Sequence, residues 1–91
     1  MVRNNMRQIT IDCRGFVPRS DLHDAFARAL SFPDWYGNNL DALYDCLTEI
    51  SGKVRLLDWE TAENRLGSYG KKAKKAIAAA ALHNTKLDLY L

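Results

Sequence analysis

Three acidic side chains stand at four-residue spacing in the middle of the chain: Asp41, Asp45 and Glu49. Positions four apart lie on one face of an α-helix, so the spacing predicts a stripe of carboxylates. Such a stripe can accept charge-assisted hydrogen bonds from the cationic groups of a partner. An enzyme would also need a nucleophile with its base, or a cofactor loop, and the sequence spaces none of these around the stripe. We therefore expect a binding surface and no enzymatic activity.

The first two carboxylates differ in what else could explain them. Asp41 lies in the first turn of the expected helix, where the macrodipole stabilises a carboxylate by about 0.3 to 1 kcal/mol, so a structural role explains it as well as a binding role does. Asp45 lies mid-helix, with like charges four residues away on both sides and no basic residue at the neighbouring positions. Each such repulsion costs a few tenths of a kcal/mol. A solvated acidic face is the alternative explanation for this stripe.

Aromatic residues accompany the acidic stripe. Trp35 and Tyr36 precede the expected helix, and Tyr44 lies on its shoulder, between the acidic and apolar faces. Trp and Tyr are enriched at binding hot spots, where their rings exclude water from a charge contact. We expect Tyr36 to pack in the core and Trp35 and Tyr44 to be available to a partner.

Charge is segregated along the chain. Residues 29–52 contain no Lys or Arg, whereas the whole chain has a net charge of +2. A second function is suggested by a basic cluster, Lys71, Lys72, Lys74 and Lys75, which could contact phosphates in a nucleic-acid-binding module. No aromatic residue separates these lysines and no recognition motif surrounds them, so a solvated helix face explains them as well.

Size and composition indicate one globular domain spanning residues 1–91, since 47% of the residues are hydrophobic and 26% are charged. No apolar run reaches the roughly 18 to 20 residues that a membrane span needs, and no secretory signal is visible, so we expect a cytoplasmic protein.

Cys13 and Cys46 are isolated and are expected to be free thiols. His23 and His83 stand apart from other ligand types, so neither a metal nor a cofactor is expected.

The expected elements alternate between strands and helices. A strand is predicted over residues 6–12, a helix over 21–31 with Ser20 as N-cap, and a second helix capped by Asn38 or Asn39. In that second helix Leu40, Leu43, Cys46, Leu47 and Ile50 form the apolar face.

The second half of the chain continues the alternation. Residues 54–57 are predicted to form a strand buried on both faces, followed by a short helix that Asp58 caps and that ends near Gly67. A fourth helix is predicted over residues 71–83 and stops at Asn84, and Leu87, Leu89 and Leu91 alternate as a last strand. This order predicts an α/β fold, a small three-stranded parallel sheet packed by about four helices.

Residues 35–48, with the sequence WYGNNLDALYDCLT, resemble the core motif of the barstar family, and Ser20, Asp21, Leu22 and His23 also resemble that family. The resemblance implies a barstar-like fold and an inhibitor, a monomer when free, that blocks a basic microbial ribonuclease with the second helix and the preceding loop. It implies that Asp45 is the central contact, in the place of a substrate phosphate. The other contacts it implies are Trp35, Gly37, Asn39, Asp41 and Tyr44.

The chain departs from the family pattern in two respects. The resemblance leads us to expect a further acidic contact in the fourth helix, where this chain has Ala79, and no acid occurs between Glu63 and Asp88. The net charge is slightly positive, so long-range steering toward a basic enzyme is expected to be weaker, while the local acidic stripe can still guide the final approach.

Overall fold

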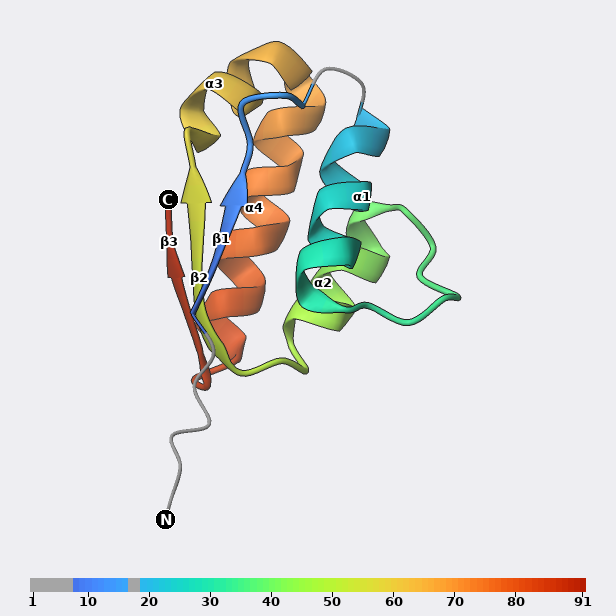
Figure 1. The fold of residues 1–91 in the computed structure, drawn as a ribbon, viewed down its shortest axis with the longest axis vertical. Coiled ribbons are helices and arrows are strands. Elements are labelled where there is room, and N and C mark those ends of the chain that lie inside the picture. The colour runs from blue at the N-terminus through green and yellow to red at the C-terminus, as the bar shows by residue number, and fades with distance from the viewer. Residues whose placement is uncertain (1–7, 17–18) are drawn as a thin grey trace.

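The computed structural model describes residues 8–16 and 19–91. Figure 1 shows the elements, whose order is β1 (Gln8–Asp12), α1 (Arg19–Leu30), α2 (Leu40–Leu47), β2 (Gly52–Leu57), α3 (Trp59–Leu66), α4 (Ser68–His83) and β3 (Leu87–Tyr90). The predicted order of strands and helices is confirmed. The beginning of the predicted first strand, residues 6 and 7, lies outside the described residues.

The three strands form one sheet in the order β1-β2-β3, and both neighbouring pairs are parallel. Parallel neighbours need crossover connections, and here α1 and α2 connect the first pair while α3 and α4 connect the second. The helices gather on one side of the sheet (Figure 1). The predicted three-stranded parallel sheet with its helices is therefore confirmed.

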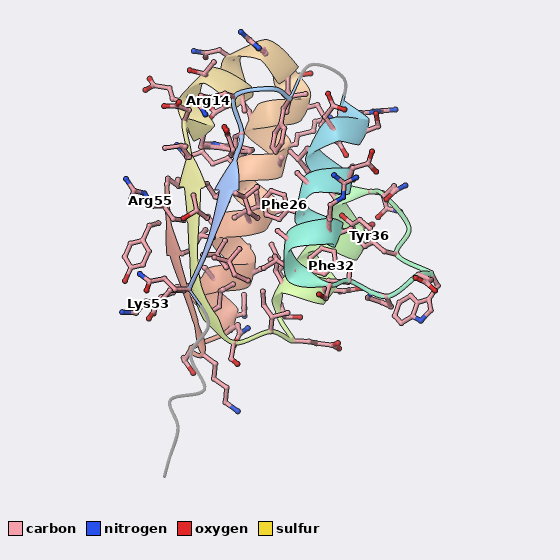
Figure 2. The ribbon with its side chains drawn as sticks, in the orientation of Figure 1. Arg14, Phe26, Phe32, Tyr36, Lys53 and Arg55 are labelled. Atoms are coloured by element: carbon pink, nitrogen blue, oxygen red, sulfur yellow. The ribbon has the colours of Figure 1, made fainter. Side chains whose placement is uncertain are left out.

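The prediction that the central strand is buried on both faces is wrong. Val54 and Leu56 are buried, but Lys53 and Arg55 are exposed. Figure 2 shows Lys53 and Arg55 directed away from the helices. The physical reason is that helices cover only one face of this sheet, so the strand alternates between apolar and charged residues.

The core lies between the covered face of the sheet and the helices. Leu22, Phe26 and Leu30 of α1 are buried there, which confirms the predicted face of that helix. α1 begins at Arg19, so Ser20 lies in its first turn and is not the N-cap that we predicted. Among residues 8–16 and 19–91, no helix combines the length and the apolar character that a membrane span requires.

The helices of the second half differ slightly from prediction at their starts. α4 begins at Ser68, three residues before the predicted start, because the left-handed Gly67 (φ 64°) directly joins it to α3. Asp58 lies at the predicted N-cap of α3, but its φ is 57° and its side chain makes no capping hydrogen bond. Asn84 is the C-cap of α4, as predicted.

Candidate functional site

The start of α2 is fixed by one side chain. Asn39 has extended backbone angles (φ −139°, ψ 170°), and its Oδ1 accepts a hydrogen bond from the backbone N–H of Ala42 at 2.7 Å. Its Nδ2 donates to the carbonyl oxygen of Gly37 at 3.3 Å. The N-cap is therefore Asn39, and Asn38 instead adopts the left-handed conformation (φ 54°) just before it.

The loop that leads into α2 is held by a buried hydrogen-bonded chain of three rings. His23 Nδ1 lies 2.6 Å from the Tyr36 hydroxyl, and His23 Nε2 lies 2.6 Å from the Tyr69 hydroxyl. Burial lowers the pKa of His23; the positive charge of Arg19 lowers it further, and the negative charge of Asp24 opposes both. The neutral ring can donate at one nitrogen and accept at the other, so this chain joins the loop to α1 and α4.

Tyr36 packs in the core, as predicted. Its side chain is buried, and its ring centroid lies 4.9 Å from that of Phe32. Burial raises the pKa of the Tyr36 hydroxyl, so this group remains a neutral hydrogen-bonding partner of His23. By contrast, the neighbouring Trp35 is 81% exposed, which makes its ring available to a partner.

Within α2 the acidic and apolar faces separate as predicted, but the helix ends at Leu47, so the last predicted position of each face, Glu49 and Ile50, lies beyond it. Leu43 and Leu47 are buried, whereas Asp41, Asp45 and Glu49 are exposed. Within residues 8–16 and 19–91, none of these three carboxylates makes an ion pair. The acidic face thus carries negative charge that this part of the chain does not neutralise by contact.

A hollow of about 430 Å³ lies between the loop and α2. We call it the acidic hollow; its lining residues are Trp35, Tyr36, Gly37, Ala42, Asp45, Cys46, Thr48 and Glu49. In the described part of the chain, no Lys or Arg belongs to this lining. Burial raises the pKa of the Cys46 thiol, and the charges of Glu49 and Asp45 raise it further. Cys46 is therefore held as a neutral thiol rather than as a nucleophile.

Asp41 and Asn39 line a second hollow, of about 340 Å³, on the other side of the helix start. Arg19 and Tyr69 also line it, and the Arg19 guanidinium carbon lies 5.0 Å from the centre of the Tyr69 ring. The structure thus places a cation near Asp41 but not in the acidic hollow. No pattern in the sequence predicts this, because Arg19 and Tyr69 come from α1 and α4 and approach α2 only through packing.

Tyr44 lies at the boundary between α2 and α4. Its ring centroid is 6.2 Å from that of the exposed His83, with an interplanar angle of 75°. Where the resemblance led us to expect an acid on α4, this helix carries Ala79 and, one turn later, His83. Of the six predicted contact residues, Trp35, Gly37 and Asp45 therefore meet at the acidic hollow, while Asn39, Asp41 and Tyr44 lie around its helix.

The basic cluster of α4 is partly neutralised. Glu63 of α3 lies 3.8 Å from Lys71 Nζ and 4.0 Å from Lys74 Nζ, and it accepts a hydrogen bond from Trp59 Nε1 at 3.0 Å. A carboxylate within ion-pair distance of two of the four lysines lowers the positive charge that a phosphate would meet there, so the arrangement weakens the case for a nucleic-acid-binding surface.

No group of three or more His, Cys, Asp or Glu side chains that could hold a metal ion occurs in the described part of the chain. The candidate site is consequently a surface that offers carboxylates, an exposed indole and a shallow hollow to a partner.

Comparison with known proteins identifies the family of the chain. The family model for barstar, a barnase inhibitor, matches residues 6–88. A Bacillus subtilis protein named "Putative ribonuclease inhibitor YrdF" is 42% identical over 78 residues, which cover 82% of this chain and 86% of the relative. The family consists of inhibitors rather than enzymes. The chain, with its parallel sheet and its acidic helix, therefore belongs to the barstar family.

Proposed function

We propose that this protein inhibits a small basic microbial ribonuclease by covering its active site with α2 and the preceding loop. Family membership and the name of the Bacillus subtilis relative support a ribonuclease as the partner. Ribonucleases of this kind bind a polyanionic substrate, so their active sites are cationic. An acidic surface is the complement that such a site requires.

The observation that carries the proposal is the acidic hollow. Asp45, Glu49 and the exposed Trp35 all line it, and no Lys or Arg of residues 8–16 and 19–91 does. Placing several like charges together without partners costs free energy in the free protein. That cost is recovered when a partner inserts an Arg, Lys or His side chain between the carboxylates and the indole.

Asp45 is the central contact in this mechanism. Its carboxylate lies on the exposed face of a helix whose opposite face is fixed in the core by Leu43 and Leu47. We infer that it takes the place of a substrate phosphate and accepts hydrogen bonds from cationic groups of the enzyme. Inhibition is then competitive and reversible, because both the inhibitor and RNA require the same groups.

The remaining contact residues surround Asp45. Trp35 offers its ring for stacking. Gly37 presents backbone without a side chain, and a Cβ there would lie 3.1 Å from Asn39 Nδ2 and crowd the cap of α2. Asp41 and Tyr44 extend the surface toward Tyr69 and His83 of α4. Asn39 contributes mainly through the conformation of this loop, since its side chain is used in the cap.

The proposal is tested by measuring the inhibition of a panel of small basic microbial ribonucleases by the purified protein. We expect near-stoichiometric inhibition of at least one enzyme, reduced in Asp45→Ala and retained in the matched control Asp88→Ala. Asp88 is exposed on β3, in the sheet rather than on α2. Absence of inhibition across a broad panel would contradict the proposal.

The alternative, a nucleic-acid-binding function, is tested by RNA binding at increasing salt. Salt-sensitive RNA binding that is lost in Lys72→Gln with Lys75→Gln would favour this alternative.

A further inference from the structure

The end of α2 presents a structural problem, because this helix has only eight residues and carries the acidic surface. The last carbonyl groups of a helix have no partner within it, and a short helix is marginally stable by itself. Two backbone bonds close the last turn, from Thr48 N to the carbonyl oxygen of Tyr44 at 3.0 Å and from Glu49 N to that of Cys46 at 3.1 Å. The next carbonyl, that of Leu47, needs a donor from elsewhere.

Asn84 supplies this donor from the C-cap of α4. Its Nδ2 donates to the carbonyl oxygen of Leu47 at 2.9 Å and to that of Ile50 at 2.6 Å. Its Oδ1 accepts from the backbone N–H of Lys86 at 3.1 Å. Asn84 is only 9% exposed, so water cannot readily replace these bonds.

The chemistry of the side chain suits this place closely. Both amide hydrogens of Asn84 are used on carbonyl oxygens, and the amide oxygen is used on an N–H. An aspartate of the same shape would lose both donors and would place negative charge against two carbonyl oxygens. An alanine would leave the Leu47 carbonyl without this partner.

We infer that Asn84 is a positioning residue for partner binding, one that holds the C-terminal end of α2 so that its carboxylates are presented in one arrangement. The anchored Leu47 lies two residues after Asp45, and Glu49 lies between the two anchored carbonyl groups. Because the same amide also fixes Lys86, it joins α2, the end of α4 and the approach to β3. The inference rests on the proposed function, since it concerns the surface that binds the ribonuclease.

A preformed surface binds more tightly than a mobile one, because less conformational entropy is lost on association. Loss of the two Asn84 hydrogen bonds to the carbonyl groups of Leu47 and Ile50 frees the last turn of α2 in the unbound protein. The acidic hollow then forms only on binding. The expected effect is a lower affinity without any change in the groups that touch the partner. Asn84 itself lies beneath the surface and makes no contact with the enzyme in this account.

The first experiment measures the inhibition constant of Asn84→Asp and Asn84→Ala against a ribonuclease that the wild-type protein inhibits. We expect both variants to weaken inhibition at least about tenfold, the effect of losing one to two hydrogen bonds. Asn64→Asp makes the same change at an exposed position of α3 and should leave inhibition unchanged. Val54→Ala, in the buried face of β2, controls for a general loss of stability and should also inhibit normally while it remains folded.

A double-mutant cycle with Asp45→Ala separates positioning from a merely structural role. If Asn84 acts by presenting Asp45, its substitution should cost much less affinity when Asp45 is already absent. An equal loss in both backgrounds, or an equal loss in Val54→Ala, would overturn the inference. Wild-type inhibition by Asn84→Asp and Asn84→Ala would overturn it as well.

Hydrogen exchange of the backbone amides gives a readout that needs no partner. We expect the amides of α2 to exchange faster in Asn84→Ala than in the wild type, Asn64→Asp or Val54→Ala, while α3 is unaffected. Unchanged exchange in α2 would overturn the inference even if inhibition is observed. If the wild-type protein inhibits no ribonuclease, the proposed function fails, and the exchange result still decides whether Asn84 holds α2.

Discussion

At the scale of single residues, two buried polar side chains hold the recognition segment in place, in addition to the packing of the apolar core. His23 and Asn84 are the buried polar residues of residues 8–16 and 19–91, and each connects elements that are distant in sequence. His23 joins the loop to two helices, and Asn84 joins the other end of α2 to α4. The recognition segment is thus held at both ends by side chains that do not belong to it.

The burial of His23 predicts a pH dependence of stability. Its pKa in the folded protein is lowered from the ordinary value of 6.5, so the unfolded chain binds the proton more readily. The contribution of His23 to the free energy of unfolding should therefore be fully present above about pH 6.5. It should be lost as the pH falls from about 6.5 toward the lower folded-state pKa. Urea denaturation at a series of pH values measures this slope.

His23→Gln removes the titrating group and should flatten the slope over this pH range, at the expense of the two tyrosine hydrogen bonds. The exposed His83→Gln is the matched control and should keep the wild-type slope. Parallel pH profiles for the wild type and His23→Gln would show that another group is responsible.

Gly70 is a second residue whose type is dictated by packing. A Cβ at this position would lie 2.4 Å from the carbonyl oxygen and 2.8 Å from the Cα of Glu63, so α3 and α4 would have to separate. We predict that Gly70→Ala lowers the free energy of unfolding by about 1 to 3 kcal/mol, although alanine favours helices by up to about 1 kcal/mol. Gly15→Ala, where no atom lies within 4 Å of the new Cβ, should be close to neutral in the same denaturation experiment. A stabilised Gly70→Ala variant would contradict this account.

At the scale of elements, α2 depends on its cap. Asn39→Ala removes the hydrogen bond to the Ala42 N–H and should lower the free energy of unfolding by about 1 kcal/mol. Asn39→Ser keeps a capping oxygen and should restore most of this loss. Thermal denaturation of the two variants distinguishes the cap from a purely surface role, for which both substitutions would be neutral.

The sequence was sufficient to predict the order of the elements, because their hydrophobic periods and their Gly, Pro and Asn boundaries are local signals. It also predicted the acidic face of α2, since all of its residues lie within one short segment. The single-sided sheet was missed: the run containing Val54 and Leu56 was interpreted as apolar, although Arg55 interrupts it. Whether helices cover one or both faces depends on tertiary arrangement, which a strand's own residues do not determine.

The parts of the site that could not be predicted come from other elements. Arg19 and Tyr69 approach Asp41, His83 approaches Tyr44, and Asn84 anchors the end of α2 only because the helices pack together. Asn84 ends α4, as the sequence predicts, but its hydrogen bonds to the end of α2 could not be predicted from its position in the sequence. A side chain that caps one helix can also satisfy the carbonyl groups of a second, and the sequence shows only the first function.

At the scale of the whole molecule, charge is unevenly distributed. The net charge is +2, yet the acidic residues of α2 lie apart from Lys53 and Arg55 on the open face of the sheet. A dipolar molecule of this kind is oriented by the field of a basic enzyme even though its total charge is unfavourable. Association should therefore depend on local rather than net charge.

This predicts how the association rate responds to salt and to added charge. The rate with an inhibited ribonuclease should fall as NaCl is raised from about 0.05 to 0.5 M, because exposed charges become screened. His83→Glu, which adds an acid beside Tyr44, should accelerate association more than Gln8→Glu, which adds the same charge on the open sheet face. Stopped-flow measurements decide the matter, and equal rates for the two variants would show that net charge alone controls steering.

The most direct test of the central claim is the dissociation constant of Asp45→Ala with a ribonuclease that the wild-type protein inhibits, measured beside Asp88→Ala. We predict that Asp45→Ala loses at least about 2 kcal/mol of binding free energy, as expected of a desolvated hot-spot carboxylate, while its fold is retained. Asp88→Ala should bind as the wild type does. A loss below about 1 kcal/mol for Asp45→Ala in a verified complex would contradict the role of Asp45 and, with it, the proposed use of the acidic hollow.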